Sequence, residues 1–219
     1  MLSFFYKRSF LMKDIKYHYA YNELNELVAI EDVDEVYRQN HSFHCINCGD
    51  EMIARLGCTR IHHFSHKKCQ ESCNIETYLH KLAKIVLKQK FYSESKFNIS
   101  LVRHCICEKS KDCMFYDSNE CCESICETFD LKEYYDTCSE EKGVDGYIAV
   151  LLLTDSSGKY KHPILIEFVV THKCSSDKRE SGLRIIEIKI DDEYDITRLK
   201  TEAITEENAE FIGFSKESK

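Results

Sequence analysis

The chain has 219 residues, a net charge of −8 and 43% apolar residues, values that fit a soluble globular protein of one or two domains. The acidic balance excludes a protein that is basic over its whole surface, the usual pattern of bulk nucleic-acid binding. No run of about 18 apolar residues exists, and the N-terminal MLSFFYKRSFLMK is too short and too charged for a signal peptide, so we expect a cytoplasmic protein without membrane spans. Thiols stay reduced there, so the 13 cysteines favour metal binding over disulfides.

The first predicted elements are a strand pair over residues 19–31 and, after it, a metal-binding motif. Two ligand pairs of the form Cys-x2-Cys and His-x2-His are separated by fourteen residues, enough for a short β-hairpin. Each pair lets one tight turn direct two side chains at one ion. The motif predicts a zinc-ribbon-like module with the ligands Cys45, Cys48, His63 and His66. The alternative is four unrelated residues in a chain rich in both types.

Charge is unevenly distributed along the chain. Residues 55–96 hold nine Lys and Arg against three acids, whereas residues 105–145 hold twelve acids against four lysines. A basic segment beside a metal module can contact a phosphate backbone, and the alternative is a solvated helix face. The candidate nucleic-acid contacts are Lys67, Lys68, Lys81, Lys84 and Lys88.

The clearest predicted helix begins after Asn74, in the segment NIETYLHKLAKIVLKQKF. Apolar residues recur at helical spacing with lysines opposite, and Asn74 is a suitable N-cap. Glu76 and His80 stand four residues apart, so they share one face of this helix.

Residues 105–126 hold six cysteines and few apolar residues, a composition that cannot form a core. The segment predicts a cysteine-rich insert with a second zinc site. Surface thiols without a ligand role are the alternative. The candidate ligands are Cys105, Cys107, Cys113 and one of Cys121, Cys122 or Cys126.

The C-terminal part is predicted to be rich in strands. Two apolar runs around a polar turn predict a hairpin covered on both faces. A polar stretch predicts a short helix, followed by a further strand and a last helix. These elements occupy, in order, residues 147–154, 164–170, 174–182, 183–190 and 197–208.

Glu167 lies inside the apolar run ILIEFVV. A carboxylate in a buried strand costs several kcal/mol unless it is paired or holds a metal. In an αβββαβ arrangement Glu167, Asp145 and Glu76 would form an oxygen-ligand site for Mg²⁺ or Mn²⁺. Alternatively, Glu167 lies half-exposed at an edge or pairs with a lysine such as Lys178.

Several segments together resemble the CoiA-like competence proteins, a group of the PD-(D/E)XK nucleases. The resemblance covers about residues 17–195. It includes the Cys-x2-Cys and HFSH motifs, the helix ETYLHKLAK, the strand IEFVVTH, Lys178 and the strand RIIEI. It implies an α+β or α/β fold with a restriction-endonuclease-like αβββαβ core at residues 74–219, after a zinc module at residues 1–73.

Two positions depart from the superfamily pattern. Glu-x-Lys is expected at the strand, but Val169 stands two residues after Glu167. Lys178 or His172 is the candidate replacement cation. Val150 stands where relatives carry the catalytic Asp, which leaves Asp145 as the candidate.

The resemblance implies a Mg²⁺-dependent deoxyribonuclease of DNA uptake, recombination or defence, with protein partners in a larger complex. Glu167 and Asp145 would hold the metal, Glu76 would orient water, and Lys178 or His172 would stabilise the transition state. His80 would contact phosphate. The alternative is a catalytically degenerate DNA-binding or adaptor protein.

Overall fold

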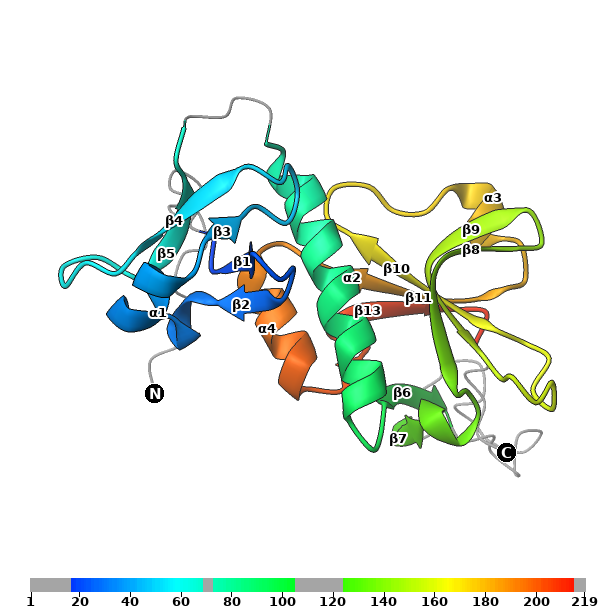
Figure 1. Ribbon diagram of the computed structural model, residues 1–219. Coiled ribbons are helices and arrows are strands. Elements are labelled where there is room, and N and C mark those ends of the chain that lie inside the picture. The colour runs from blue at the N-terminus through cyan, green and yellow to red at the C-terminus, as the bar shows by residue number, and fades with distance from the viewer. Residues whose placement is uncertain (1–16, 69–72, 105–123, 215–219) are drawn as a thin grey trace, which may run out of the picture. The chain divides into compact units, whose positions relative to one another are not determined.

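The computed structural model describes residues 17–68, 73–104 and 124–214. The chain divides into two compact units, residues 1–82 and 83–219, and the boundary falls inside helix α2 (Ile75–Ser93). Figure 1 shows that both units combine strands with helices, so the fold is mixed α and β.

The N-terminal unit is built on a five-stranded antiparallel sheet in the order β2-β1-β3-β4-β5. The strand pair predicted at residues 19–31 is confirmed. In strand β4 Met52 and Ala54 share the buried face, Ile53 between them is half-buried, and Glu51 and Arg55 are exposed. The strands are β1 Tyr19–Asn22, β2 Leu27–Ala29, β3 Phe43–His44, β4 Glu51–Arg55 and β5 His63–His66. The 3-10 helix η1 (Ile30–Asp32) and helix α1 (Glu35–Asn40) connect β2 to β3.

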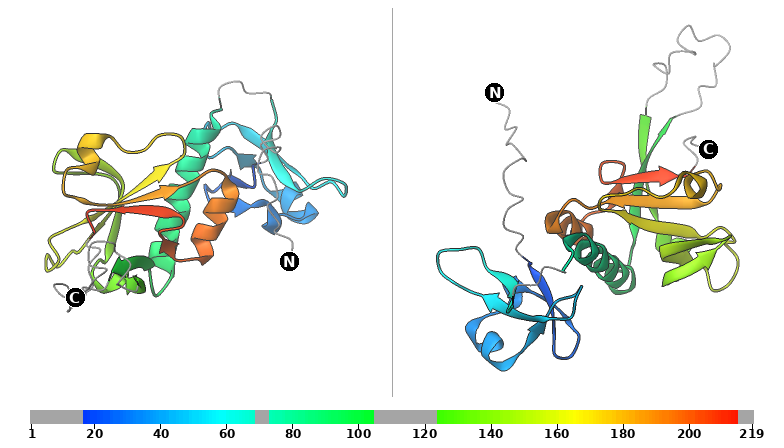
Figure 2. Two further views of the ribbon diagram at one scale, coloured as in Figure 1. Left: turned by 180° about the vertical axis from the view of Figure 1, so that it is seen from behind. Right: turned by 90° about the horizontal axis from the view of Figure 1, so that it is seen from above.

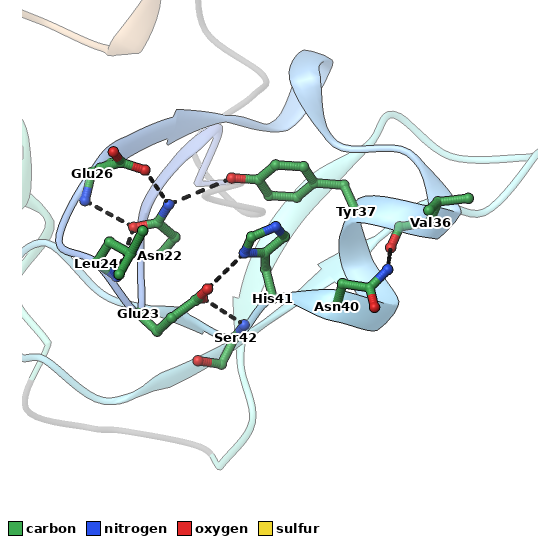
Figure 3. A network of polar contacts seen from close by, with 9 residues as sticks. All are labelled: Asn22, Glu23, Leu24, Glu26, Val36, Tyr37, Asn40, His41 and Ser42. Carbon is green, nitrogen blue, oxygen red and sulfur yellow. Dashed lines mark hydrogen bonds and ion pairs between the residues drawn. The ribbon is translucent and has the colours of Figure 1, made fainter.

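Asn22 holds the turn between β1 and β2 and is 1% exposed. Its Oδ1 accepts hydrogen bonds from Leu24 N at 3.0 Å and Glu26 N at 2.9 Å. Its Nδ2 donates to Glu26 Oε2 at 2.8 Å and to Tyr37 Oη at 3.5 Å, as Figure 3 shows. Every polar atom of this buried amide therefore has a partner, which a buried polar group needs.

Replacing Asn22 with alanine should destabilise the N-terminal unit by about 1–3 kcal/mol, because two main-chain donors of the turn would lose their acceptor and the space of a buried side chain would be left. Chemical denaturation of the wild-type and variant proteins measures the difference. Asn40 is the matched control in the same region (Figure 3), since its Nδ2 makes one exposed bond, to Val36 O at 2.8 Å. Asn40→Ala should change stability by less than about 0.5 kcal/mol. Equal losses in both variants would contradict the structural role of Asn22.

Helix α2 confirms the clearest prediction from the sequence. Asn74 caps it, with Oδ1 accepting from Glu76 N at 2.8 Å. Its apolar stripe is buried along the whole length: Tyr78, Leu79 and Leu82 in the N-terminal unit, and Ala83, Val86, Leu87 and Phe91 in the C-terminal unit.

The C-terminal unit contains a five-stranded mixed sheet in the order β13-β11-β10-β9-β8 (Figures 1 and 2). Strands β8, β9 and β10 are antiparallel neighbours, β10 and β11 are parallel, and β13 is antiparallel to β11. The short helix α3 (Ser176–Arg179) lies in the crossover from β10 to β11. The predicted hairpin, short helix and following strand are confirmed. The strands are β8 Thr137–Val144, β9 Tyr147–Thr154, β10 Ile164–Val169, β11 Arg184–Lys189 and β13 Ala209–Ile212.

A smaller three-stranded sheet, in the order β12-β6-β7, completes this unit. Strands β6 (Asn98–His104) and β7 (Ser124–Asp130) form an antiparallel pair, β12 (Ile204–Thr205) is parallel to β6, and the 3-10 helix η3 (Leu131–Glu133) follows β7. The C-terminal half of α2 lies beside helix α4 (Glu193–Thr201), as Figure 2 shows. Lys90 Nζ joins them, donating to Leu199 O at 2.8 Å and to Glu202 O at 2.6 Å.

The last helix begins earlier than predicted. The prediction of residues 197–208 is wrong because α4 starts after Asp192, whose carboxylate accepts from Tyr194 N and Asp195 N and caps the helix. The helix ends at Thr201 and β12 follows. Among the residues that the structure describes, no helix has both the length and the apolar character needed to cross a bilayer.

Candidate functional site

A tight turn after β3 carries the first two candidate metal ligands, Cys45 and Cys48. Cys45 N donates to Asp50 O at 2.8 Å, and Gly49 N donates to Cys45 O at 2.9 Å. Gly49 has φ +75°, a left-handed conformation that glycine adopts without strain. The turn therefore brings both thiols to one side.

Four ligand atoms meet at this turn, from Cys45, Cys48, His66 and Cys73, and all lie within 4.8 Å of one another. The Sγ atoms of Cys45 and Cys73 are 3.6 Å apart, and Cys48 Sγ is 3.3 Å from His66 Nε2. A tetrahedral zinc ion would separate two sulfurs by about 3.8 Å and a sulfur from a nitrogen by about 3.6 Å. This Cys3His set therefore fits a structural zinc ion in both donor type and spacing.

His63 is not part of this cluster, which corrects the predicted ligand set. His63 and His66 are three residues apart on strand β5, so their side chains point to opposite faces. In the pairing with β4, His66 is opposite Met52 whereas His63 is opposite Arg55, near the far end of the hairpin. His63 Nδ1 lies 2.9 Å from Ile61 O.

Cys73 supplies the fourth ligand, which the sequence motif did not predict. It directly precedes Asn74, the N-cap of α2, so its position is fixed by the start of the helix. Asn47 Nδ2 lies 3.7 Å from Cys73 Sγ and donates to Asn74 O at 3.0 Å. A cysteine beside a clear N-cap was the available signal.

An aromatic side chain, Tyr17, packs against the cluster. The Tyr17 ring packs edge-on against His66, and burial raises the pKa of the Tyr17 hydroxyl beside Cys73. Burial also raises the pKa of the Cys45 thiol and raises that of Cys48 to about 12. Neutral thiols are thus favoured without a cation, and metal binding must release their protons.

Residues 105–123 lie outside the described residues, and with them Cys105, Cys107, Cys113, Cys121 and Cys122 of the predicted second zinc site. Cys126 is described and is an exposed residue of β7.

Residues 28–76 match the family model described as Competence protein CoiA, N-terminal domain. Over these residues the N-terminal unit is similar to the N-terminal domain of CoiA competence proteins. The match contains all four members of the Cys3His cluster, and the C-terminal unit lies beyond it. No curated protein and no solved structure matches the chain.

The C-terminal unit contains a buried ion pair on the central strand β10. Glu167 and Lys178 are each 8% exposed, and Lys178 Nζ lies 2.6 Å from Glu167 Oε1. Lys178 Nζ also donates to Ile148 O at 2.7 Å, and Val150 N donates to Glu167 Oε1 at 3.3 Å. Burial raises the pKa of Glu167, and the neighbouring Lys178 opposes that effect.

Two further glutamates stand in register with Glu167 on neighbouring strands: Glu187 on β11 and Glu210 on β13. Arg179 forms ion pairs with both Glu187 and Glu210. Cys174 N donates to Glu187 Oε1 at 2.8 Å. Residues that stand opposite each other on paired strands point to the same face, so these glutamates form a row across the sheet. Cations from the crossover neutralise this row.

Asp145 is not brought to Glu167. It occupies the two-residue turn between β8 and β9, is exposed and has φ +47°. It stands five strand positions from Val150, whose main-chain N donates to Glu167 Oε1, and five positions of a strand span roughly 16 Å. The fold therefore does not bring the predicted magnesium pair of Asp145 and Glu167 together, because the Asp-Gly dipeptide forms the hairpin turn.

The other predicted catalytic residues have separate positions. His172 is exposed in the segment after β10. Glu76 and His80 lie half-buried in the first two turns of α2 and belong to the N-terminal unit.

Most of the predicted nucleic-acid contacts are engaged with protein groups. Lys67 pairs with Glu51 at 2.7 Å, and Lys81 Nζ donates to Asn47 O at 3.0 Å. Lys84 pairs with Glu141 at 2.8 Å and Glu140 at 3.1 Å, and Lys88 pairs with Glu140 at 2.6 Å. Lys68 is exposed. The basic segment is thus partly neutralised by acids of the following one.

Proposed function

We propose that the protein is a metal-dependent nuclease-like protein that acts on DNA phosphodiester bonds, with the Cys3His module as its scaffold. The buried Glu167–Lys178 pair carries the proposal. It combines one acidic and one basic group on and beside the central strand of a sheet, as phosphodiester hydrolysis requires. The name of the CoiA family, competence protein, supports a role in DNA uptake or processing.

The order of elements gives a second line of support. Helix α2 is followed, after the β6–β7 pair, by β8, β9, β10, α3 and β11. This is the αβββαβ order of restriction-endonuclease-like cores. In this proposal Lys178 from α3 replaces the lysine that the superfamily pattern expects at Val169.

The residues around Glu167 suit a hard divalent cation. Glu167 Oε1 and Ile148 O point at one place, and Mg²⁺ binds one or two carboxylates or carbonyls together with several waters. Mg²⁺ or Mn²⁺ at such a site supplies positive charge to a scissile phosphate. In this arrangement Glu167 holds the cation, and Lys178 neutralises charge on a non-bridging phosphate oxygen.

The zinc module has a structural role in this proposal. Four protein ligands close a tetrahedral coordination sphere, so no position is left for water or substrate. Cys73 and the Lys81 bond to Asn47 tie the module to the start of α2.

A catalytically degenerate DNA-binding or adaptor protein is the second candidate. Val150 favours it, because an apolar residue, which contacts Glu167 through its main-chain N, stands where the superfamily carries its aspartate. Such a protein would bind DNA through phosphate contacts with a strong salt dependence.

Cleavage of labelled single- and double-stranded DNA with Mg²⁺ or Mn²⁺ tests the proposal. Glu167→Gln should slow cleavage by about 100-fold or more, since it removes the carboxylate that would hold the cation. Asp145→Asn is the matched control, because asparagine also suits a left-handed turn and should cleave like the wild type.

Equal cleavage by the wild type and Glu167→Gln would show that Glu167 holds no catalytic cation. Salt-dependent DNA binding without cleavage by either protein would support the adaptor instead.

A further inference from the structure

Lys178 lies where a divalent cation would bind. Its Nζ atom is 2.6 Å from Glu167 Oε1 and 2.7 Å from Ile148 O. These oxygens belong to the adjacent strands β10 and β9, and both are directed at one buried cation. A main-chain carbonyl and a carboxylate are hard oxygen donors of the kind that Mg²⁺ and Mn²⁺ prefer.

The crossover that carries Lys178 is fixed to the sheet at several points. Arg179 binds Glu187 and Glu210, and Tyr147 Oη donates to Asp177 O at 3.1 Å. Ser181 Oγ donates to Lys178 O at 2.7 Å. Because the backbone of α3 is held, movement of the ammonium requires rotation of the Lys178 side chain itself.

The other ionisable groups that face Glu167 leave Lys178 as its neutralising cation. Glu187 and Cys174 both interact electrostatically with Glu167 or with its partner Lys178. Glu187 is neutralised by Arg179, and burial raises the pKa of the Cys174 thiol to about 12, so this thiol stays neutral. Among the residues that the structure describes, Glu167 therefore has one cationic partner, which a metal ion would have to replace.

We propose that Lys178 is a built-in competitor for the divalent cation at Glu167, so that metal binding and the Glu167–Lys178 ion pair exclude each other. A metal ion about 2.1 Å from Glu167 Oε1 and Ile148 O would occupy the space of the ammonium group, and the two positive charges repel. The identity of the metal rests on the proposed function.

Displacement would also prepare Lys178 for its role. An ammonium released from Glu167 stays tethered beside the site, where it can meet a phosphate oxygen. The lysine would then become available for substrate only after the metal has entered. Metal binding would thus release the Lys178 ammonium, which can then stabilise negative charge in the transition state.

Manganese binding to the zinc-loaded full chain tests this competition without any nucleic acid. Electron paramagnetic resonance of free Mn²⁺ gives the affinity for the wild type, Lys178→Met and Lys178→Gln. Both variants should bind Mn²⁺ at least about tenfold more tightly than the wild type, because the competing charge is gone. Adding Glu167→Gln to Lys178→Met should abolish this gain.

Lys173→Met is the matched control, since Lys173 lies on the same segment but pairs with the exposed Glu210 at 2.7 Å. It should bind Mn²⁺ like the wild type. Lys178→Gln keeps a hydrogen-bond donor for Ile148 O and Glu167, so it gives an answer if Lys178→Met fails to fold.

Unchanged or weaker Mn²⁺ affinity in the folded Lys178 variants would overturn the proposal. The nuclease proposal is tested separately. Tighter Mn²⁺ binding by the variants without DNA cleavage by the wild type would contradict the nuclease proposal and support competition between Lys178 and the metal. DNA cleavage by the wild type with unchanged Mn²⁺ affinity in the variants would support the nuclease proposal and contradict the competition.

Discussion

Cys73→Ser should abolish zinc retention and cause cooperative loss of structure in the N-terminal unit. Structural zinc ions contribute about 10–16 kcal/mol in small zinc-dependent domains, because the site forms only in the folded state. Cys73 also stands directly before the N-cap of α2, so its loss frees the start of that helix. Zinc content by mass spectrometry and thermal unfolding by circular dichroism measure both effects.

His63→Ala is the control that the structure provides for this experiment. His63 has the same two-residue spacing from His66 that the motif suggests, but it lies on the opposite face of β5. The variant should keep one equivalent of zinc and the wild-type melting temperature. Loss of zinc in His63→Ala together with retention in Cys73→Ser would restore the ligand set read from the sequence.

The second large effect is expected in the C-terminal unit, where Lys178→Met should cost about 3–5 kcal/mol of stability. The substitution leaves Glu167 as an uncompensated charge that is 8% exposed. The double variant Glu167→Gln, Lys178→Met should recover most of this loss, since both charges are then removed. Urea denaturation of the single and double variants measures their coupling.

The loss of folding stability caused by Lys178→Met should become smaller as the pH falls. Burial raises the pKa of Glu167, and removing Lys178 takes away the partner that opposes this shift. The folded variant then holds a proton that the unfolded chain releases, so its stability decreases as the pH rises above the unfolded pKa of about 4.3. Lowering the pH toward that value should reduce the difference in unfolding free energy between the variant and the wild type.

Lys173→Met provides the comparison for an exposed pair. Lys173 and Glu210 are 63% and 46% exposed, and such pairs contribute less than about 1 kcal/mol. A stability difference between Lys178→Met and the wild type that does not change with pH would mean that the Glu167 charge is not buried in solution. A stability loss no larger than that of Lys173→Met would mean the same.

Local signals account for the parts of the fold that the sequence predicted. Helix α2 follows from its apolar period and from Asn74, and β9 and β10 follow from apolar runs. Strands β8 and β13 form the edges of their sheet, and the sequence of β8, TCSEEKGV, is mostly polar. Pairing with β9 makes this segment a strand, and pairing is a tertiary effect.

The candidate sites also combine features that local sequence predicts with features that depend on tertiary pairing. Cys45 and Cys48 share a turn, which the sequence shows, whereas the face of a strand decides between His63 and His66. A charged residue inside an apolar run requires a partner, so Glu167 could be singled out. The register that aligns it with Glu187 and Glu210 arises only when β10, β11 and β13 pair.

The pairing of β6 with β7 has a consequence for how the chain can evolve. Their ladder runs from Asn98 opposite Asp130 to His104 opposite Ser124, so the two described residues that flank positions 105–123 are neighbours in the sheet. A segment whose two ends already meet can change in length at little cost to the rest of the fold. The cysteines between those ends can therefore be gained, lost or exchanged in a lineage without rebuilding the sheet.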